Sequence, residues 1–582
     1  MKTRLISLIA GIATLASCSN GPADGTYRLE LLTTNDVHGR WFDTGYTDGK
    51  VRNSLFAVNH YVDSVRNCAG AGNVVLVDAG DCLQGDNAAY YFNYVDTLSP
   101  HLFPRLVKYM GYDAIVVGNH DIETGHPVYD RVTRELEAEG IPFLAGNAIR
   151  NDNGKPYFRT YITLQRGGVK VAVLGFTNPN MKAWLSENIW SGMTFESLLP
   201  LVQQEVDKVI RKEKPQVVIV AVHSGSGNGD GSMLESQGLD LFKSLRGVDF
   251  VVTSHDHRAL TAANDSIAFI NSGSHAKNLG HGTVELTVKD GKVVSKKLSA
   301  GLIKVDADSA DAAMKETFSK EYETVKAFTL RTVGELKSEL RTRDAYMGMS
   351  DYINLIHTLG LSGTGADISF AAPLTYNGTI SAGTLVYNDL FTIYPFENQL
   401  FTLKMSGREI KDYLEYSYDQ WICTVDFSGR GEHILKIRKG DDMRFNQDNW
   451  SFVNRSYNFD SAAGINYTVD VTRPAGERVS ISSMADGREF SMDADYIVAM
   501  TSYRASGGGM LLERGAGIAD SDSRIMEKYP ELRNILYEYL QKNGAIDPAV
   551  TGDTSVIGQW RFIPEKEARK ALERDMELLF GR

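Results

Sequence analysis

The sequence of 582 residues contains only four cysteines and 15 prolines, and after residue 16 it has no long apolar run. So few cysteines exclude a fold that depends on a network of disulfides. The lack of long apolar runs excludes a protein that crosses the membrane several times. Basic residues are also scarce, since 61 Lys and Arg against 73 Asp and Glu give a net charge of −12. This charge would repel a polyanion such as DNA, so we predict no nucleic-acid partner, and an anionic substrate would need a local site or a metal.

The composition is typical of a soluble globular protein. Apolar residues make up 43%, aromatic residues 10% and charged residues 23% of the chain, which excludes disorder, collagen and a long coiled coil. Because one hydrophobic core does not extend over a chain of this length, we expect roughly two to four domains.

The first 18 residues have the features of a targeting segment. Lys2 and Arg4 precede an apolar run over 5–16 that is too short to span a bilayer comfortably. The sequence Leu-Ala-Ser-Cys at 15–18 resembles a bacterial lipobox in which Cys18 is lipidated. We therefore predict a lipoprotein signal peptide over 1–18 and a monomeric body outside the cytoplasm, attached to a bacterial membrane through lipid alone. An ordinary secretory signal with an incidental cysteine is the alternative.

Three cysteines lie beyond this segment, at positions 68, 82 and 423. A bridge between Cys68 and Cys82 is compatible with an exported protein, but the sequence does not establish it.

Strand-like and helix-like segments alternate up to about residue 300. The strand candidates are short β-branched runs at 29–33, 74–77, 114–117, 171–174, 217–222 and 250–252. Segments long enough for helices lie between them, which indicates an α/β fold with mostly parallel or mixed sheets. Several runs end in polar or acidic residues, and ligands in such folds bind beyond the carboxyl ends of the strands.

Composition also divides the chain. We expect a first domain over 27–305 and a connecting helix over 306–337, a charged segment with almost no Gly or Pro. We expect a hinge in this segment, because few contacts should cross it. Residues 338–560 are richer in Gly, Asn and Tyr and form the expected second domain, and 561–582 are predicted to form a terminal amphipathic helix.

Metal-ligand residue types follow the strands of the first domain. They occur at Asp36-Val37-His38, Gly80-Asp81, Gly118-Asn119-His120-Asp121, His223 and His255-Asp256-His257. Carboxylate oxygen combined with neutral imidazole suits Zn²⁺, Mn²⁺ or Fe²⁺. A single histidine at a strand end is more often an ordinary surface or core residue, but the recurrence after successive strands indicates a metal site. The two glycines would let the backbone come close to that site.

These segments carry a resemblance to a known family. TTNDVHGR (33–40), VDAGDCLQGD (77–86), VVGNHDIETG (116–125), AVHSG (221–225) and TSHDH (253–257) resemble the calcineurin-like metallophosphoesterase signature. More narrowly, they resemble the bacterial 5'-nucleotidase and 2',3'-cyclic-nucleotide phosphodiesterase family over almost the whole mature chain. The resemblance implies a four-layer αββα metallophosphoesterase sandwich, followed by a C-terminal α/β substrate-binding domain.

The resemblance also implies two divalent metal ions (Zn, Mn or Fe) about 3.5 Å apart. One ion would be held by Asp36, His38 and His257, the other by Asn119, His223 and His255, and the Asp81 carboxylate would bridge both. A water between two such ions loses a proton near neutral pH and can serve as the nucleophile, so no Ser or Cys nucleophile is required.

His120 follows a predicted ligand, so we expect its ring to stabilise the transition state or the leaving oxygen. Many relatives have Asp three residues beyond this histidine, where this chain has Glu123. Glu123 can still orient His120, and Asp121 is the alternative. Cys82, beside Asp81, is interpreted as a small buried residue in preference to a soft ligand.

In the second half, residues 365–415 resemble the family's nucleoside-binding domain. The segments 457–460 with 464–467 and 502–509 are most similar to the cyclic-phosphodiesterase/3'-nucleotidase branch, in which two aromatic rings sandwich the base. We therefore predict that Tyr457 and Tyr503 stack on the base, with glycines 507–509 allowing close approach. A packed strand end is the alternative interpretation.

The second half also departs from the 5'-nucleotidase pattern. Residues 371–380 contain none of the arginines that grip the substrate in many 5'-nucleotidases, and Arg504 is predicted to compensate. This favours the cyclic or 3' branch, although Tyr-Pro-Phe-Glu-Asn at 394–398 resembles the 5'-nucleotidase pattern.

The leading prediction is a two-metal phosphohydrolase that removes phosphate from extracytoplasmic nucleotides, with a preference for 2',3'-cyclic or 3'-nucleotides. A 5'-nucleotidase/UDP-sugar hydrolase and an enzyme acting on a sulfur compound are alternatives. A lipoprotein that binds nucleotides without turnover would be expected to lack at least one metal ligand, whereas all seven are present.

Overall fold

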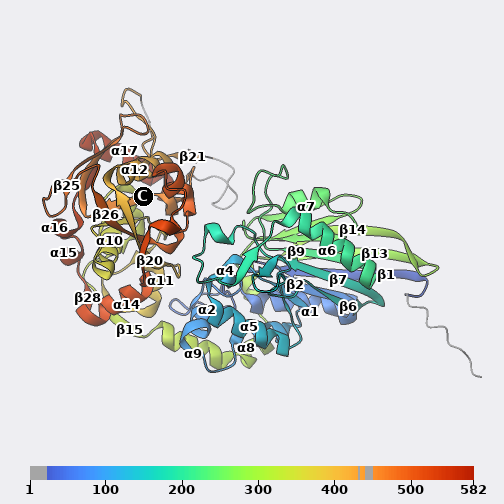
Figure 1. Cartoon of the computed structure of the whole chain (residues 1–582). Coiled ribbons are helices and arrows are strands. Elements are labelled where there is room, and N and C mark those ends of the chain that lie inside the picture. The colour runs from blue at the N-terminus through green and yellow to red at the C-terminus, as the bar shows by residue number, and fades with distance from the viewer. Residues whose placement is uncertain (1–21, 430–432, 440–449, 582) are drawn as a thin grey trace, which may run out of the picture.

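The computed structural model describes residues 22–429, 433–439 and 450–581. The predicted signal peptide and Cys18 lie outside these residues. Figure 1 shows two lobes, the first built from the N-terminal half and the second from the C-terminal half. Within the described part, no helix has both the length and the apolar character needed to cross a membrane.

The first domain contains two six-stranded sheets. One has the order β14-β13-β1-β2-β3-β4 and the other β11-β12-β10-β9-β7-β6. Their bounds are β1 Gly25–Thr34, β2 Val74–Asp78, β3 Ala114–Val116, β4 Phe143–Leu144, β6 Tyr161–Arg166, β7 Val169–Phe176, β9 Val217–Val222, β10 Phe250–Thr253, β11 Ala259–Ala263, β12 Ala268–Ser272, β13 Asn278–Lys289 and β14 Lys292–Lys304. All six strands predicted from β-branched runs are present. Adjacent strands run parallel from β1 through β2 and β3 to β4 in the first sheet, and from β7 through β9 to β10 in the second.

The side chains of these strands alternate between two cores. Leu31 and Val77 lie in the cluster between the two sheets, whereas Leu32 and Leu76 lie in the outer cluster. This period of two is expected for strands buried on both faces. The outer face of the first sheet is covered by α1 (Leu55–Ala69), α3 (Leu102–Met110) and α5 (His126–Ala138), and that of the second sheet by α6 (Leu198–Glu213) and α7 (Gly238–Ser244). The structure therefore has the predicted four αββα layers.

The predicted single helix over 306–337 is wrong. The segment contains two helices, α8 (Ala312–Thr317) and α9 (Ser319–Thr329), separated at the buried Phe318, whose ring packs near Phe56 in the first core. Residues Thr332–Leu336 form β15, which pairs with β19 (Gly383–Val386) and β28 (Ala545–Ile546) of the second domain. High charge with little Gly or Pro did not distinguish a helix from a strand that is paired on both sides.

The second domain is built on a five-stranded sheet of order β23-β17-β26-β20-β27. These strands are β17 Ile368–Ala371, β20 Gln399–Ser406, β23 Ser461–Ala463, β26 Asp495–Thr501 and β27 Ile525–Glu531. The expected terminal helix is α17 (Glu565–Phe580), preceded by β29 (Trp560–Ile563), which pairs with β24 (Ile465–Asp470). Both elements belong to the core of the second domain.

The remaining elements include helices that contribute to the cores of the second domain, among them α10, α12 and α14, and shorter strands and helices. They are α2 Asn87–Tyr90, α4 Asn119–Glu123, β5 Ala148–Arg150, β8 Met193–Phe195, β16 Leu340–Arg341, α10 Asp351–Thr364, β18 Thr379–Ile380, α11 Tyr387–Ile393, α12 Gly407–Trp421, β21 Ile437–Lys439, β22 Trp450–Phe452, β25 Val479–Met484, α13 Ser502–Ala505, α14 Leu532–Asn543, α15 Pro548–Thr551 and α16 Thr554–Ile557.

The two domains also contact each other beside the connecting helix α9, whose Phe328 packs near Tyr90. Tyr90 of α2 lies in an apolar cluster made mainly by α10, α11 and α14 of the second domain. The Tyr90 hydroxyl donates to Asn534 at 3.3 Å, and Asn87 donates to Asn388 at 2.8 Å. Contacts therefore cross the boundary close to the loop that follows β2.

Candidate metal centre

The predicted metal ligands converge at the carboxyl ends of parallel strands. Asp36 and His38 follow β1, Asp81 follows β2 and Asn119 begins α4 after β3, while His223 follows β9 and His255 and His257 follow β10. Backbone hydrogen bonds join the first two loops, with Asp36 N–H donating to Gly80 O and His38 N–H donating to Asp81 O, both at 2.9 Å. The two sheets thus present their loops to one site, as the rule for α/β folds predicts.

Backbone strain is concentrated in these loops. Five of the seven predicted ligands have positive φ angles: Asp36 (48°), His38 (49°), Asp81 (63°), His255 (69°) and His257 (59°). Such angles in residues other than glycine cost of order 1–3 kcal/mol each and persist where function requires them. Gly80 and Gly118 make the tight packing possible, because a Cβ atom at Gly118 would lie 2.1 Å from Asp81 Oδ1.

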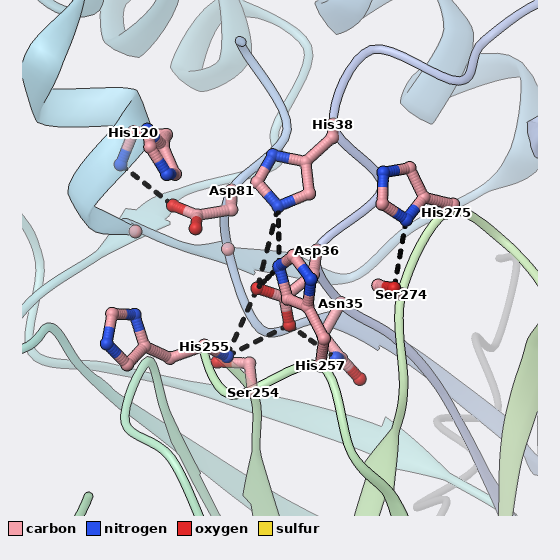
Figure 2. A network of polar contacts seen from close by, with 12 residues as sticks. Asn35, Asp36, His38, Asp81, His120, Ser254, His255, His257, Ser274 and His275 are labelled. Carbon is pink, nitrogen blue, oxygen red and sulfur yellow. Dashed lines mark hydrogen bonds and ion pairs between the residues drawn. The ribbon is translucent and has the colours of Figure 1, made fainter. Parts of the chain in front are cut away.

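The first group of side chains consists of Asp36, His38 and His257. The Nε2 atoms of the two histidines face each other at 2.9 Å, and Asp36 Oδ1 lies 3.5 Å from His257 Nε2. Figure 2 shows both rings turned toward the Asp36 carboxylate. Burial, followed by the charge of His257, lowers the pKa of His38 well below its ordinary value, so its ring is neutral and able to bind a metal.

The second group consists of Asp81, His223 and His255, joined by Asn119. Asn119 Oδ1 lies 3.0 Å from His223 Nε2 and 2.9 Å from His255 Nδ1, and Asp81 Oδ2 lies 3.1 Å from His223 Nε2. The other nitrogen of His223 lies 2.8 Å from the Ala79 carbonyl oxygen. This contact fixes the ring so that Nε2 points into the site.

Both groups fit divalent cations. Each offers carboxylate or amide oxygen with imidazole nitrogen, the donor set that Zn²⁺, Mn²⁺ and Fe²⁺ accept. In each group the donor atoms of the carboxylate and the two imidazoles lie within 4.8 Å of one another, and two of the three side chains are buried. Burial opposes ionisation of Asp81, but the charges of His223 and His120 outweigh it and hold its pKa well below the ordinary value. The assignment of each residue to a particular ion stays a prediction.

His120 lies at the start of α4, beside the second group. Its backbone N–H donates to Asp81 Oδ1 at 2.9 Å, and its Nδ1 lies 2.7 Å from Glu123 Oε2. Burial alone lowers the pKa of His120, but Asp81, Glu123 and Glu397 together raise it to about 10. The longer side chain of Glu123 therefore does reach the ring.

Asp121, the alternative partner of His120, has another position. Its carboxylate accepts hydrogen bonds from the backbone N–H groups of Gly118, Asp81, Cys82 and Leu83 at 2.8–3.0 Å. These bonds tie the β2 loop to α4, so Asp121 supports the site through the backbone.

The cysteines do not join the metal groups. Cys82 is buried, and its Sγ donates to Asp78 Oδ1 at 3.1 Å. Burial raises the pKa of its thiol well above the ordinary value, which agrees with the interpretation as a small core residue. Cys68 is exposed, and both thiols are free, so the Cys68–Cys82 bridge is absent.

Several residues near the site were not predicted. Asn35 donates to Asp36 Oδ2 at 2.6 Å, and the Ser254 hydroxyl lies 3.0 Å from His223 Nδ1. Both directly precede predicted ligands, so their place in the motifs could have indicated them. His275 lies with its ring 5.4 Å from that of His38, and the Trp184 ring stacks on His255 at 5.0 Å. No sequence signal singled out either residue.

Tyr457 and Tyr503 are neighbours, as predicted, but their rings are not parallel. The centroids lie 6.3 Å apart with an interplanar angle of 85°. Together with Ala371, Leu374 and Asn398 they line a pocket in the second domain. Gly508 lies against the ring of Tyr503, because a Cβ atom there would come within 2.5 Å of it. This glycine therefore allows close packing on Tyr503 rather than close approach to a ligand.

Arg504 is not available for the predicted substrate contact. Its side chain is almost fully buried, and Nε and Nη2 donate to the two carboxylate oxygens of Asp460 at 3.0 and 2.8 Å. The other N–H groups reach Asn458 Oδ1 and the carbonyl oxygens of Tyr457 and Gly508. All five donors are used within the protein, so Arg504 joins the segments that carry the two tyrosines.

Comparison with known proteins agrees with this geometry. Residues 29–259 match the calcineurin-like phosphoesterase family, and residues 330–513 match the 5'-nucleotidase C-terminal domain. The chain joins a calcineurin-like phosphoesterase domain to a 5'-nucleotidase C-terminal domain. Calcineurin-like phosphoesterases bind divalent metals, and this phosphoesterase has the matching groups of ligands.

The similar proteins are named as nucleotidases or nucleotide phosphoesterases. A 2',3'-cyclic-nucleotide 2'-phosphodiesterase/3'-nucleotidase of Yersinia enterocolitica is 21% identical over 93% of this chain and 90% of its own length. A 5'-nucleotidase of Vibrio cholerae is 23% identical over 92% of this chain and 95% of its own. The trifunctional nucleotide phosphoesterase YfkN of Bacillus subtilis is 23% identical, but the alignment covers only 39% of its length. The structure of a provisionally assigned 5'-nucleotidase of Staphylococcus aureus with alpha-ketoglutarate has the same fold (TM-score 0.75, 21% identity, 92% and 99% of the two chains).

Proposed function

We propose that this phosphoesterase removes phosphate from nucleotides outside the cytoplasm with two divalent cations, and that it prefers 2',3'-cyclic or 3'-nucleotides. The observation that carries the proposal is the convergence of two adjacent ligand groups, one around Asp36 and one around Asp81, with His120 beside them. The names of the relatives support nucleotides as the substrate class.

The protein's own residues would organise the reaction as follows. A pair of bound cations would polarise the phosphoryl group and make a water molecule nucleophilic near neutral pH. Asp36, His38 and His257 would hold one cation, Asn119, His223 and His255 would hold the other, and the Asp81 carboxylate would serve both. Glu123 occupies Nδ1 of His120, so Nε2 is left to stabilise the developing charge or to protonate the leaving oxygen.

The pocket of the second domain would hold the base. Tyr457 and Tyr503 would provide stacking surfaces, which are worth about 1–3 kcal/mol per base. Because their rings now meet edge to face, one ring must turn for a base to lie between them. The segment 371–380 supplies no arginine, and Arg504 is engaged by Asp460, so base stacking rather than ion pairing would select the substrate here.

The branch preference has a specific alternative. A 5'-nucleotidase or UDP-sugar hydrolase would use the same metal centre, and the 5'-nucleotidase name among the relatives keeps this alternative open. A nucleotide-binding lipoprotein without turnover is not favoured, since every ligand of both groups is present.

A phosphate-release screen tests the proposal. The metal-loaded protein would be assayed with 5'-AMP, 3'-AMP, 2',3'-cyclic AMP and UDP-glucose, the last by release of UMP. We expect the highest kcat/KM for the cyclic or 3' substrate. A higher value for 5'-AMP or UDP-glucose would assign the alternative branch, and no hydrolysis of any nucleotide by metal-loaded protein would refute the proposed substrate class.

We also propose that Cys18 carries the lipid that attaches a monomeric body to the membrane. The supporting observations are the 15–18 motif and the start of β1 at Gly25, only a few residues later. Palmitate labelling of wild type and Cys18→Ser tests this directly. We expect the wild type to be labelled and the variant to be unlabelled. An unlabelled wild type would instead indicate an ordinary secretory signal.

A further inference from the structure

Trp184 stacks on one of the predicted metal ligands. Its ring centre lies 5.0 Å from that of His255, with an interplanar angle of 26°. Trp184 belongs to the segment between β7 and β8, and β7, β9 and β10 run parallel. This segment therefore leaves the second sheet at the same edge as the loops that carry His223 and His255. The indole is also partly buried against the outer core of the first sheet, so it contacts both that core and the metal centre.

Contacts beyond Trp184 hold its segment in place. Trp190 is buried in the same core, and its Nε1 donates to the Leu185 carbonyl oxygen at 2.9 Å. The hydroxyl of Tyr129 in α5 donates to the Ile189 carbonyl oxygen at 3.0 Å. Trp184 is thus presented to the metal centre by a segment that is fixed to the rest of the first domain.

The two histidines of the second ligand group are oriented in different ways. Nε2 of His223 points into the group, and its Nδ1 lies 2.8 Å from the Ala79 carbonyl oxygen and 3.0 Å from the Ser254 hydroxyl. In His255 it is Nδ1 that points into the group, 2.9 Å from Asn119 Oδ1. Its Nε2 makes no hydrogen bond within the part of the chain that the structure describes. Since the outer nitrogen of a metal-bound histidine is normally hydrogen-bonded, His255 lacks the protein partner that His223 has.

The backbone of His255 is fixed, which leaves the rotation of its ring. The backbone N–H donates to both carboxylate oxygens of Asp36 at 3.1 and 2.9 Å (Figure 2), and φ is 69°. The torsion that turns an imidazole about its Cβ–Cγ bond has only broad preferences of its own. The Trp184 indole opposes this rotation, because turning the imidazole would drive its edge into the stacked ring.

We propose that Trp184 is a positioning residue for His255. Its indole holds the imidazole in the plane that directs Nδ1 into the second group, the task that the Ala79 carbonyl oxygen performs for His223. The consequence is tighter binding of a divalent cation by the second group alone. The inference rests on the proposed function only in placing a cation there, and it involves no substrate.

Calorimetric titration of the metal-free, full-length protein with Mn²⁺ tests the proposal. Trp184→Leu keeps an apolar side chain but removes the flat ring. We expect it to raise one of the two Mn²⁺ dissociation constants about tenfold and to leave the other within about twofold, because loss of an orienting partner typically costs about 10–100-fold in metal affinity. Trp184→Phe, which keeps a flat ring, should stay within about twofold of wild type at both sites. Equal effects of the two variants would overturn the proposal.

A double-mutant cycle locates the effect. In a His255→Ala background, Trp184→Leu should change the Mn²⁺ affinity less than about twofold, because no ring is left to orient. An equal tenfold change in both backgrounds would show that Trp184 acts on the fold of its segment, and would overturn the positioning role.

Trp450→Leu is the matched control. Trp450 is also a partly buried tryptophan beside a histidine, with its ring centre 4.9 Å from that of His433, but both lie in the second domain. It should leave both Mn²⁺ dissociation constants unchanged. The melting temperature of the metal-free protein is measured for every variant, and a lowered value for Trp184→Leu with unchanged Mn²⁺ affinity would overturn the proposal. If Trp184→Leu does not fold, Trp184→Met, which also lacks a flat ring, replaces it with the same expected change.

Steady-state kinetics distinguishes this proposal from the proposed function. The assays use a nucleotide and bis(p-nitrophenyl) phosphate, a phosphodiester without a base. For Trp184→Leu, the Mn²⁺ concentration that gives half-maximal activity should rise about tenfold on both substrates. A raised KM confined to the nucleotide at saturating Mn²⁺, with unchanged Mn²⁺ affinity, would instead make Trp184 a substrate contact. Wild type that binds two Mn²⁺ ions but hydrolyses no nucleotide would reject the proposed function alone, and wild type that binds no Mn²⁺ would overturn the two proposals together.

Discussion

Asp81 and His120 are joined by a hydrogen bond from the His120 backbone N–H to Asp81 Oδ1, at 2.9 Å. Because Asp81 Oδ2 faces His223 at 3.1 Å, one carboxylate connects the proposed catalytic histidine with the second ligand group. A substitution of the His120 side chain that keeps this backbone hydrogen bond is therefore expected to change catalysis without changing metal occupancy.

Removal of metal should abolish activity. Exhaustive treatment with EDTA, verified by elemental analysis, is expected to leave no phosphate release, and Mn²⁺ or Zn²⁺ should restore it. Asp81→Asn should lower activity more than His223→Ala, since Asp81 is proposed to bridge both cations whereas His223 would hold only one. Full activity in protein shown to be metal-free would contradict the proposed chemistry.

Substitution of His120 should separate catalysis from metal binding. We expect His120→Ala to lower kcat by about 10²–10⁴-fold, the usual contribution of a positioned acid–base group, with two metal ions still bound. Glu123→Gln should have a smaller effect, because the amide oxygen can still accept from Nδ1. Elemental analysis provides the control, and a loss of one metal ion from His120→Ala would identify His120 as a ligand.

The sequence was sufficient to predict the scaffold. Short β-branched runs predicted the strands, because parallel strands buried on both faces need apolar residues on both faces. The residues that follow these runs predicted the metal site, because the carboxyl ends of parallel strands meet at one edge of the sheet. The contact between Glu123 and His120 could also be predicted from the sequence, since residues three positions apart on a helix lie on one face.

The second domain was harder to predict, for physical reasons. The engagement of Arg504 by Asp460 joins residues 44 positions apart that no periodicity connects. The angle between Tyr457 and Tyr503 depends on how Gly508 packs on one ring. The connecting segment was misassigned because β15 is stabilised by its partners β19 and β28 rather than by its own composition.

Arg504 should act through structure rather than through direct substrate contact. Arg504→Met leaves the buried Asp460 carboxylate without its cationic partner, with the Tyr413 hydroxyl still donating to it. We therefore expect it to destabilise the protein by about 3–5 kcal/mol and to raise KM for nucleotides by loosening the Tyr457 and Tyr503 segments. Its kcat on bis(p-nitrophenyl) phosphate should remain close to that of wild type. Denaturant unfolding and steady-state kinetics measure the two effects, and an increased KM with unchanged stability would restore Arg504 as a substrate contact.

Tyr503 should contribute to binding of the base alone. Its ring is partly buried beside Tyr457 and Gly508, and loss of stacking worth about 1.4 kcal/mol corresponds to a tenfold change in affinity. Tyr503→Ala is therefore expected to raise KM for a nucleotide about tenfold or more, whereas Tyr503→Phe, which keeps the stacking surface, should remain close to wild type. A small phosphoester without a base should be hydrolysed by both variants as by wild type, because it needs only the metal centre. Equal losses by Tyr503→Ala on the two kinds of substrate would instead show that the ring supports the fold of the second domain.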